Sequence, residues 1–131
     1  MGQRIVVDLE ELHDCFLRHF KFAGIKHGDY LKIDSNSITV VDESVYINKD
    51  ITNREVFQSE VREIVGKMWG GFAILIYYFM DEPDVLYQKE GIFILKATVE
   101  NPVFARNLEW LIEEVKSFKD GAFDDVKLVV V

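Results

Sequence analysis

His13, Cys15 and His19 are the residues of this sequence whose types and spacing come closest to a reactive or metal-binding group. Cys15 and His19 are four residues apart, so on a helix their side chains share a face, where a thiolate and an imidazole can hold zinc. Tetrahedral zinc needs at least two further ligands, but the sequence has only one other histidine, His27, and no second cysteine. We therefore expect no metal and no cofactor, and we interpret His19 as a histidine at the edge of a buried helix stripe.

The sequence also lacks the pattern of a catalytic centre. The Cys15–His19 pair has no third group to orient the histidine and no oxyanion site beside it. Carboxylates cluster within residues 8–14, 81–84, 113–114 and 120–125, but none of these clusters has the alternating spacing and central glycine of an EF-hand loop. No glycine-rich phosphate loop and no serine in a nucleophile elbow occur. These observations favour a protein that is not an enzyme.

The composition is that of a globular protein with an acidic surface. Of the 131 residues, 49% are hydrophobic, and 23 acidic residues against 15 basic ones give a formal net charge of −8. Such a field repels nucleic-acid backbones and anionic lipid, so we expect no direct nucleic acid binding and no membrane association. The single cysteine excludes an intrachain disulfide, and the longest apolar run, residues 72–80, is shorter than the roughly 20 residues that span a bilayer. We expect a single cytoplasmic domain, residues 1–131.

Three amphipathic helices are predicted from apolar residues that recur every three or four positions and from capping residues at their ends. Residues 5–7 are open to two interpretations, a short strand or the approach to the first helix. The predicted helices cover residues 8–24, 52–71 and 101–121. Their predicted first residues are Asp8, Thr52 and Asn101, and the glycines expected to end them are Gly24, Gly70 with Gly71, and Gly121.

Strands rich in β-branched residues are predicted between the helices. Residues 72–79 are apolar on both faces, which is typical of a central strand covered from two sides. The order α-βββ-α-βββ-α-β predicts an α+β fold with a mainly antiparallel sheet and three amphipathic helices. The predicted strands are residues 30–34, 38–41, 45–48, 72–79, 85–88, 92–99 and 126–131. Within the first three, the side chains expected to face the core are Leu31, Ile33, Val40, Val45 and Ile47.

Two features of this predicted fold indicate surfaces that a partner completes. Trp110 lies opposite the apolar stripe of its helix, where it is either an interface anchor or packs flat beside Arg106 or Glu114. The second feature is the sheet. If the helices cover only one face, or if the valine-rich last strand lies on an edge, a second copy of the chain is the commonest cover. The interface candidates are Trp110, Val103, Tyr77, Phe79, Val129 and Val131.

These features predict a non-enzymatic protein–protein interaction module, with an adaptor, chaperone-like or regulatory role, that forms a homodimer. One alternative is a small-ligand-binding or enzyme domain with a pocket near the first helix, lined by His13, Cys15, His19 and Tyr30. Another is an acidic inhibitor that mimics nucleic acid. The expected partner is another protein, first of all a second copy of this chain.

Overall fold

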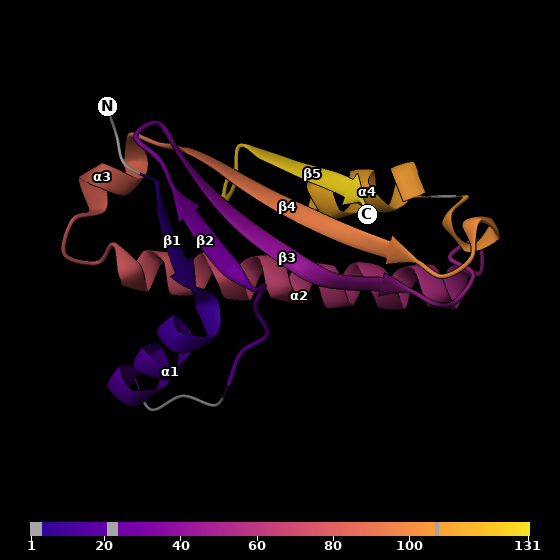
Figure 1. Cartoon of the computed structure of the whole chain (residues 1–131), viewed down its shortest axis with the longest axis horizontal. Coiled ribbons are helices and arrows are strands. Elements are labelled where there is room, and N and C mark those ends of the chain that lie inside the picture. Colours follow the sequence, from indigo (N-terminus) through magenta and orange to yellow (C-terminus); the bar gives the residue numbers. More distant parts are fainter. Residues whose placement is uncertain (1–3, 21–23, 107) are drawn as a thin grey trace.

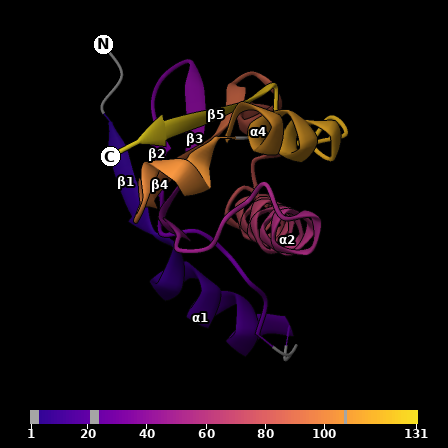
Figure 2. The same cartoon turned by 90° about the vertical axis from the view of Figure 1, so that its right-hand side faces the viewer.

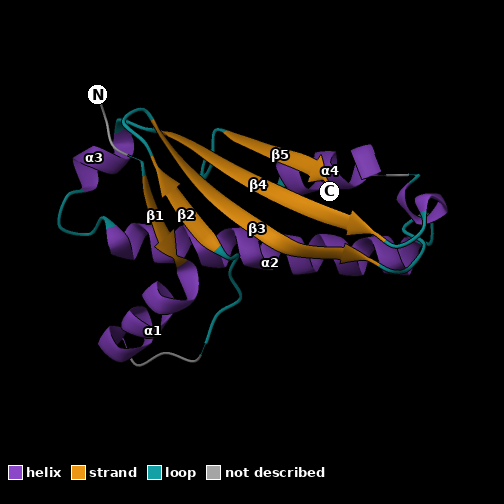
Figure 3. Ribbon diagram, viewed as in Figure 1, coloured by secondary structure: helices purple, strands orange, loops and turns teal. Residues whose placement is uncertain are grey.

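The computed structural model describes residues 4–20, 24–106 and 108–131, and these are organised around a five-stranded sheet (Figures 1 and 3). The strands are β1 (Ile5–Asp8), β2 (Tyr30–Ile33), β3 (Ser37–Ile47), β4 (Glu90–Val99) and β5 (Asp125–Val130), in that order across the sheet. β1, β2 and β3 form an antiparallel meander, whereas β4 lies parallel to β3 and β5 parallel to β4. The mixed α and β content agrees with the prediction, but the mainly antiparallel sheet was wrong because two of the four strand pairs are parallel.

The helices of the described chain lie mainly on one side of this sheet. They are α1 (Leu9–Phe20), α2 (Arg54–Tyr78), α3 (Pro83–Tyr87), the 3₁₀ helix η1 (Pro102–Ala105) and α4 (Leu108–Ser117). The prediction of three helices and its element order were therefore wrong. α2 connects β3 to β4, and α4 connects β4 to β5; crossovers between parallel strands are right-handed, which puts both helices on the same face. Figure 2 shows α2 and α4 together on that side, with α1 at one end of the sheet.

The largest departure from the predicted fold concerns residues 72–80. They were expected to form the central strand, yet α2 runs on to Tyr78 and is capped by Phe79. A run that is apolar at every position fits a buried strand or a buried helix equally well, because neither period stands out. Burial along α2 has the helical repeat of three or four residues, through Val61, Ile64, Met68, Gly71 and Leu75.

Gly70 and Gly71 were taken as the end of the helix, but they are positions of close packing inside it. A Cβ atom built at Gly70 would lie 1.7 Å from the carbonyl oxygen of Lys26, in the segment that leads into β2. A Cβ at Gly71 would lie 3.1 Å from Cγ1 of Val40 on β3. Glycine allows other chain segments to approach a helix this closely. The two glycines therefore let α2 contact both the sheet and the segment before β2.

The predicted helix starts were partly confirmed. Oδ1 of Asp8 accepts hydrogen bonds from the amides of Glu10 and Glu11 at 2.8 and 3.2 Å, as a capping residue does. Asn101 caps η1 in the same way through the amide of Val103. Thr52 was wrong as the first residue of α2, because Asn53 accepts the amide hydrogen bonds there.

Other boundaries changed where a turn or a hairpin was expected. The predicted strands at 38–41 and 45–48 are one strand, β3, whose pairing with β4 is interrupted by a bulge between Asp42 and Val45. Residues 85–88 fall largely in α3 rather than in a strand. The predicted third helix is divided into η1 and α4. Residues 5–7 belong to a strand, β1, and the predicted helix positions 21–23 lie outside the described residues.

The core lies between the sheet and α2. All five side chains predicted to face it from the first strands are buried there, namely Leu31, Ile33, Val40, Val45 and Ile47. No helix in the described ranges is both long enough and apolar enough to cross a membrane.

One buried ion pair ties α2 to β3. Asp42 is fully buried at the bulge of β3, and its Oδ2 lies 3.4 Å from Nζ of Lys67, which is 17% exposed. Oδ1 of Asp42 accepts hydrogen bonds from the amide and the hydroxyl of Ser44 at 2.9 and 2.7 Å. Asp42 follows Ile38 and Val40 on the helix-facing side of β3, just before the bulge, so its pair with Lys67 helps to fix where α2 crosses the sheet.

Candidate functional site

The face of the sheet turned away from α2 and α4 carries no helix of the described chain (Figure 2). Side chains alternate between the two faces of a strand, and the strand register aligns those on this side in rows. Tyr30, Val41, Ile94 and Lys127 form one row across β2 to β5. We call this side of the sheet the open face, and its members by register are Val6, Asp8, Tyr30, Lys32, Thr39, Val41, Ile92, Ile94, Lys96, Asp125, Lys127 and Val129. Thr39 and Val41 are buried, and the others are at least partly exposed.

A polar group lies near the centre of the open face, around the ring of Tyr30. Nζ of Lys32 and of Lys96 lie 5.7 and 6.0 Å from the centroid of this ring, at the distance of a cation–π contact. Nζ of Lys96 also donates to the Tyr30 hydroxyl at 3.3 Å and to Oε1 of Glu43 at 3.4 Å. The hydrogen bond to Tyr30, with the Glu43 carboxylate as a further cause, raises the pKa of Lys96 above its usual value. Lys96 is therefore a cation held by Tyr30 and Glu43 near the middle of the open face.

The open face continues onto the outer edge of β5. β5 is the last strand of the sheet, and among the described residues only β4 pairs with it. Val129, Val130 and Val131 are all exposed, and the amide of Val131 donates to the carbonyl oxygen of Ala97 on β4. Because successive amides of a strand point to opposite sides, the amide of Val130 points outward. The predicted valine-rich last strand is thus an edge strand whose outer backbone groups are accessible.

The other interface candidates lie away from this edge. Val103 is exposed on η1, and Trp110 is 70% exposed on α4. Tyr77 is on α2, where its ring packs edge-on against Phe16 with 5.6 Å between centroids. Phe79 is a buried member of the core.

Trp110 lines a groove between the start of α2 and α4. The groove has a volume of about 320 Å³, and Ile51 and Phe57 form its apolar wall while Arg54 and Glu114 form its charged rim. Trp110 thus lines the groove together with Glu114 while its side chain remains mostly exposed.

Replacing Trp110 by alanine is expected to lower the free energy of unfolding by less than about 1 kcal/mol, because an exposed side chain adds little to the core. Trp69→Ala is the matched control. Nε1 of Trp69 donates to the Phe118 carbonyl at 3.0 Å, and its ring packs edge-on against Phe72, so we expect a loss of about 2 kcal/mol. Urea denaturation of both variants measures the difference. Equal losses would mean that Trp110 is a packing residue of the fold.

A second, more polar cavity lies where the sequence suggested a pocket, between the first helix and the sheet. Its volume is about 580 Å³, and its wall includes four carboxylates together with His27 and Tyr30. Of the four pocket candidates, Tyr30 lines this cavity and His13 lies directly behind it, with its ring centroid 4.6 Å from that of His27. The four carboxylates belong to Asp8, Glu10, Glu11 and Asp29. We call this cavity the acidic cleft.

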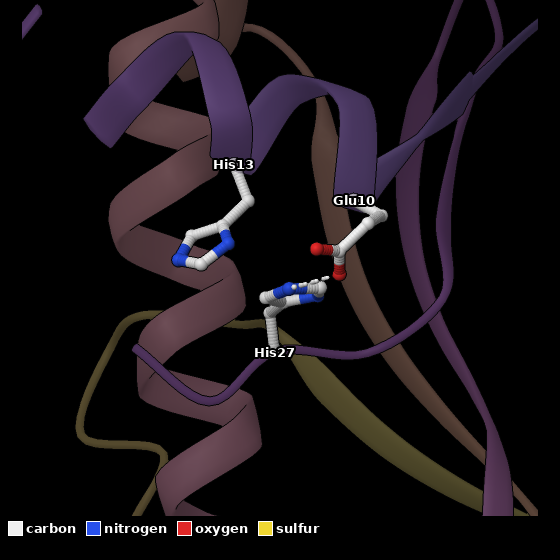
Figure 4. Close-up of side chains that lie close together, drawn as sticks. All are labelled: Glu10, His13 and His27. Atoms are coloured by element: carbon white, nitrogen blue, oxygen red, sulfur yellow. Dashed lines mark ion pairs between the residues drawn. The ribbon is translucent and has the colours of Figure 1, made fainter. Parts of the chain in front are cut away.

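The remaining pocket candidates lie elsewhere or are not described. Sγ of Cys15 lies 3.2 Å from Nη2 of Arg18, and Cys15 does not line the acidic cleft. The side chain of His19 lies outside the described residues. The structure instead brings His13 together with Glu10 on the same helix and with His27 from the segment before β2 (Figure 4).

His27 and Glu10 were missed as site residues, and the sequence contains little that would identify them. His27 is 14 residues from His13 and belongs to no helix or strand, so no spacing rule links the two. The one signal was that His27 is the only histidine outside the first helix. Comparison with known proteins finds no matching family model, no matching curated protein and no matching solved structure.

Proposed function

We propose that this chain is a non-enzymatic protein–protein interaction module that works as a homodimer, joined through the outer edge of β5. The observation that supports this proposal best is the accessible edge of β5 and its continuity with the open face. An exposed strand edge is a template for pairing with another chain, and proteins normally shorten, charge or cover such an edge. β5 is six residues long. Apart from Asp125, its first residue, it has one charged side chain, Lys127.

A second copy of this chain is the partner that suits this edge. Two β5 strands related by a two-fold axis run antiparallel, so each supplies the same outward amides and carbonyl groups to the other. The two sheets would join into one, and Val129 of each copy would be covered beside the junction. β1, the opposite edge of the sheet, has only four residues and offers fewer such groups.

The distribution of charge favours the same surface. Two copies of a chain with a net charge of −8 repel each other, and the repulsion is smallest where the acidic side chains are fewest. On this side of the sheet Lys96 and Lys127 lie on β4 and β5, with Asp125 at the start of β5, whereas Asp8 and the other carboxylates of the acidic cleft lie at the opposite end, beside β1 and β2. Contact through the edge of β5 therefore keeps the acidic clefts of the two copies apart. The groove beside Trp110 lies on α4, across the sheet from the open face, and stays free for a further protein.

Light scattering coupled to size exclusion is expected to give the mass of a dimer for the unaltered chain. Val130→Pro removes the outward amide without removing a hydrogen bond to β4, as a proline on a strand edge can do. Each dimer loses one hydrogen bond from each copy, so we expect the dimer dissociation constant to rise about tenfold or more.

Val6→Lys on β1 is the matched control, because Val6 is exposed on the opposite edge of the sheet. It should leave the dimer unchanged. A monomer at high micromolar concentration for the unaltered chain would overturn the proposal. Dissociation by Val6→Lys, with none by Val130→Pro, would place the contact at β1 instead.

A further inference from the structure

Glu10, His13 and His27 present three potential metal-ligand atoms to one another. Glu10 and His13 come from the first turns of α1, and His27 comes from the segment that leads into β2 (Figure 4). One ligand atom from each lies within 4.8 Å of the other two. His13 is buried, with 7% of its surface exposed, while Glu10 is exposed at the mouth of the acidic cleft. The cluster thus connects a buried imidazole to an open cavity.

The hydrogen bond of His27 orients it as a metal ligand. Nδ1 of His27 lies 2.6 Å from the carbonyl oxygen of Gly28, and since a carbonyl only accepts, Nδ1 carries a proton. Nε2 is then the nitrogen that points to Oε2 of Glu10, 3.1 Å away. A ligating histidine commonly donates its other ring N–H to a backbone carbonyl in this way.

His13 supplies an independent sign that a ligand is missing. Its Nδ1 is buried and has no hydrogen-bond partner among the described residues, and Figure 4 shows this edge of the ring turned toward Glu10 and His27. Buried polar atoms without a partner are uncommon and costly. Nε2 of His13 accepts from the amide of Ile25 at 3.1 Å, so in the metal-free protein the proton of this ring is on Nδ1. A metal on Nδ1 would move that proton to Nε2 and displace the Ile25 amide.

We propose that Glu10, His13 and His27 bind a divalent transition-metal ion, zinc being the best fit, through one carboxylate oxygen, Nδ1 of His13 and Nε2 of His27. Two imidazoles and a carboxylate suit zinc, whereas calcium and magnesium prefer oxygen ligands alone. Three protein ligands leave a fourth position for water on the side of the acidic cleft. Zinc would bind these three atoms in their unprotonated form and so occupy the space between Nε2 of His27 and Oε2 of Glu10. Asp8, Glu11 and Asp29, the other charged side chains of the cleft, attract the cation.

Isothermal titration of the chelator-treated, full-length chain with zinc chloride tests the proposal. We expect one zinc per chain, no comparable binding of magnesium, and a rise in Tm on adding zinc. Glu10→Gln should weaken zinc binding by about 100-fold or more, since even outer-shell partners of a metal are worth roughly 10–100-fold. Glu11→Gln is the matched control, because it removes the same charge from the next residue of α1 and from the same cleft.

These outcomes distinguish a defined zinc site from nonspecific attraction of a cation to the acidic cleft. Equal weakening by Glu10→Gln and Glu11→Gln, or no zinc binding by the unaltered chain, would overturn the proposal. Cobalt(II) substitution gives a second readout, in which His27→Gln should abolish the visible bands of a tetrahedral ion and Cys15→Ser should leave them unchanged. A thiolate charge-transfer band lost in Cys15→Ser would assign the metal to other ligands. None of these readouts depends on the dimer.

Discussion

Gly70→Ala is expected to lower the free energy of unfolding by about 2–3 kcal/mol, in the range measured for overpacked interiors. The added methyl group would lie 1.7 Å from the carbonyl oxygen of Lys26, which is backbone and cannot swing aside as a side chain does. Either α2 or the segment before β2 must move. Because His27 follows Lys26 directly, we also expect this variant to bind zinc more weakly.

Gly66→Ala, one turn earlier on α2, is the control with the same chemical change. Its Cβ would meet only Cδ of the Lys26 side chain, at 3.7 Å, which is ordinary contact. Alanine is favoured over glycine inside a helix, so this variant should gain about 0.5–1 kcal/mol. If the close approach at Gly70 is real, thermal and urea unfolding should give a lower free energy of unfolding for Gly70→Ala and a higher one for Gly66→Ala, each relative to the unaltered chain. The same sign for both would show that the segment before β2 does not lie against α2.

Lys67→Met is expected to destabilise the protein by about 3 kcal/mol, because it leaves the fully buried carboxylate of Asp42 without a cation. The two hydrogen bonds from Ser44 remain, but they compensate only part of the charge. Adding Asp42→Asn to the same chain removes that charge and keeps an acceptor for Ser44. The double variant should therefore recover about 1–2 kcal/mol relative to Lys67→Met alone.

Lys26→Met is the matched control for this prediction. Lys26 forms an ion pair with Glu63 in which both side chains are largely exposed to solvent, so the pair is screened. We expect Lys26→Met to change the free energy of unfolding by less than about 1 kcal/mol. Chemical denaturation of the four chains, including the unaltered one, gives the comparison. If both lysine variants lose the same amount, the burial of Asp42 does not isolate it from water.

The local features of this fold could be predicted from the sequence wherever neighbouring residues decide them. The meander side chains, such as Leu31 and Val40, alternate with a period of two and were assigned to the core correctly. Asp8 and Asn101 cap helices through amides two or three residues away, which needs no knowledge of the rest of the chain. The valine-rich final strand was also found, because β-branched residues recur there without a helical period.

Residues 72–80 show where local reasoning failed. An all-apolar run contains no period, and two preceding glycines are the usual mark of a helix end. The helix continues because Gly70 and Gly71 contact Lys26 and Val40, which are distant in sequence, so that packing outweighs the local cost of glycine. The cluster of Glu10, His13 and His27 has the same origin. It exists only because the segment before β2 returns to α1.

The amino-acid sequence by itself thus determined which residues are core, where several helices begin, and that the last strand is a hydrophobic one in need of pairing. It also raised the question of what covers the two faces of the sheet. Only the tertiary structure decided that question. Parallel pairing of β3 with β4 and of β4 with β5 requires right-handed crossovers, and these place α2 and α4 on one face. Strand direction depends on contacts between residues far apart in the chain, so the open face and the free edge of β5 appear only once the chain is folded.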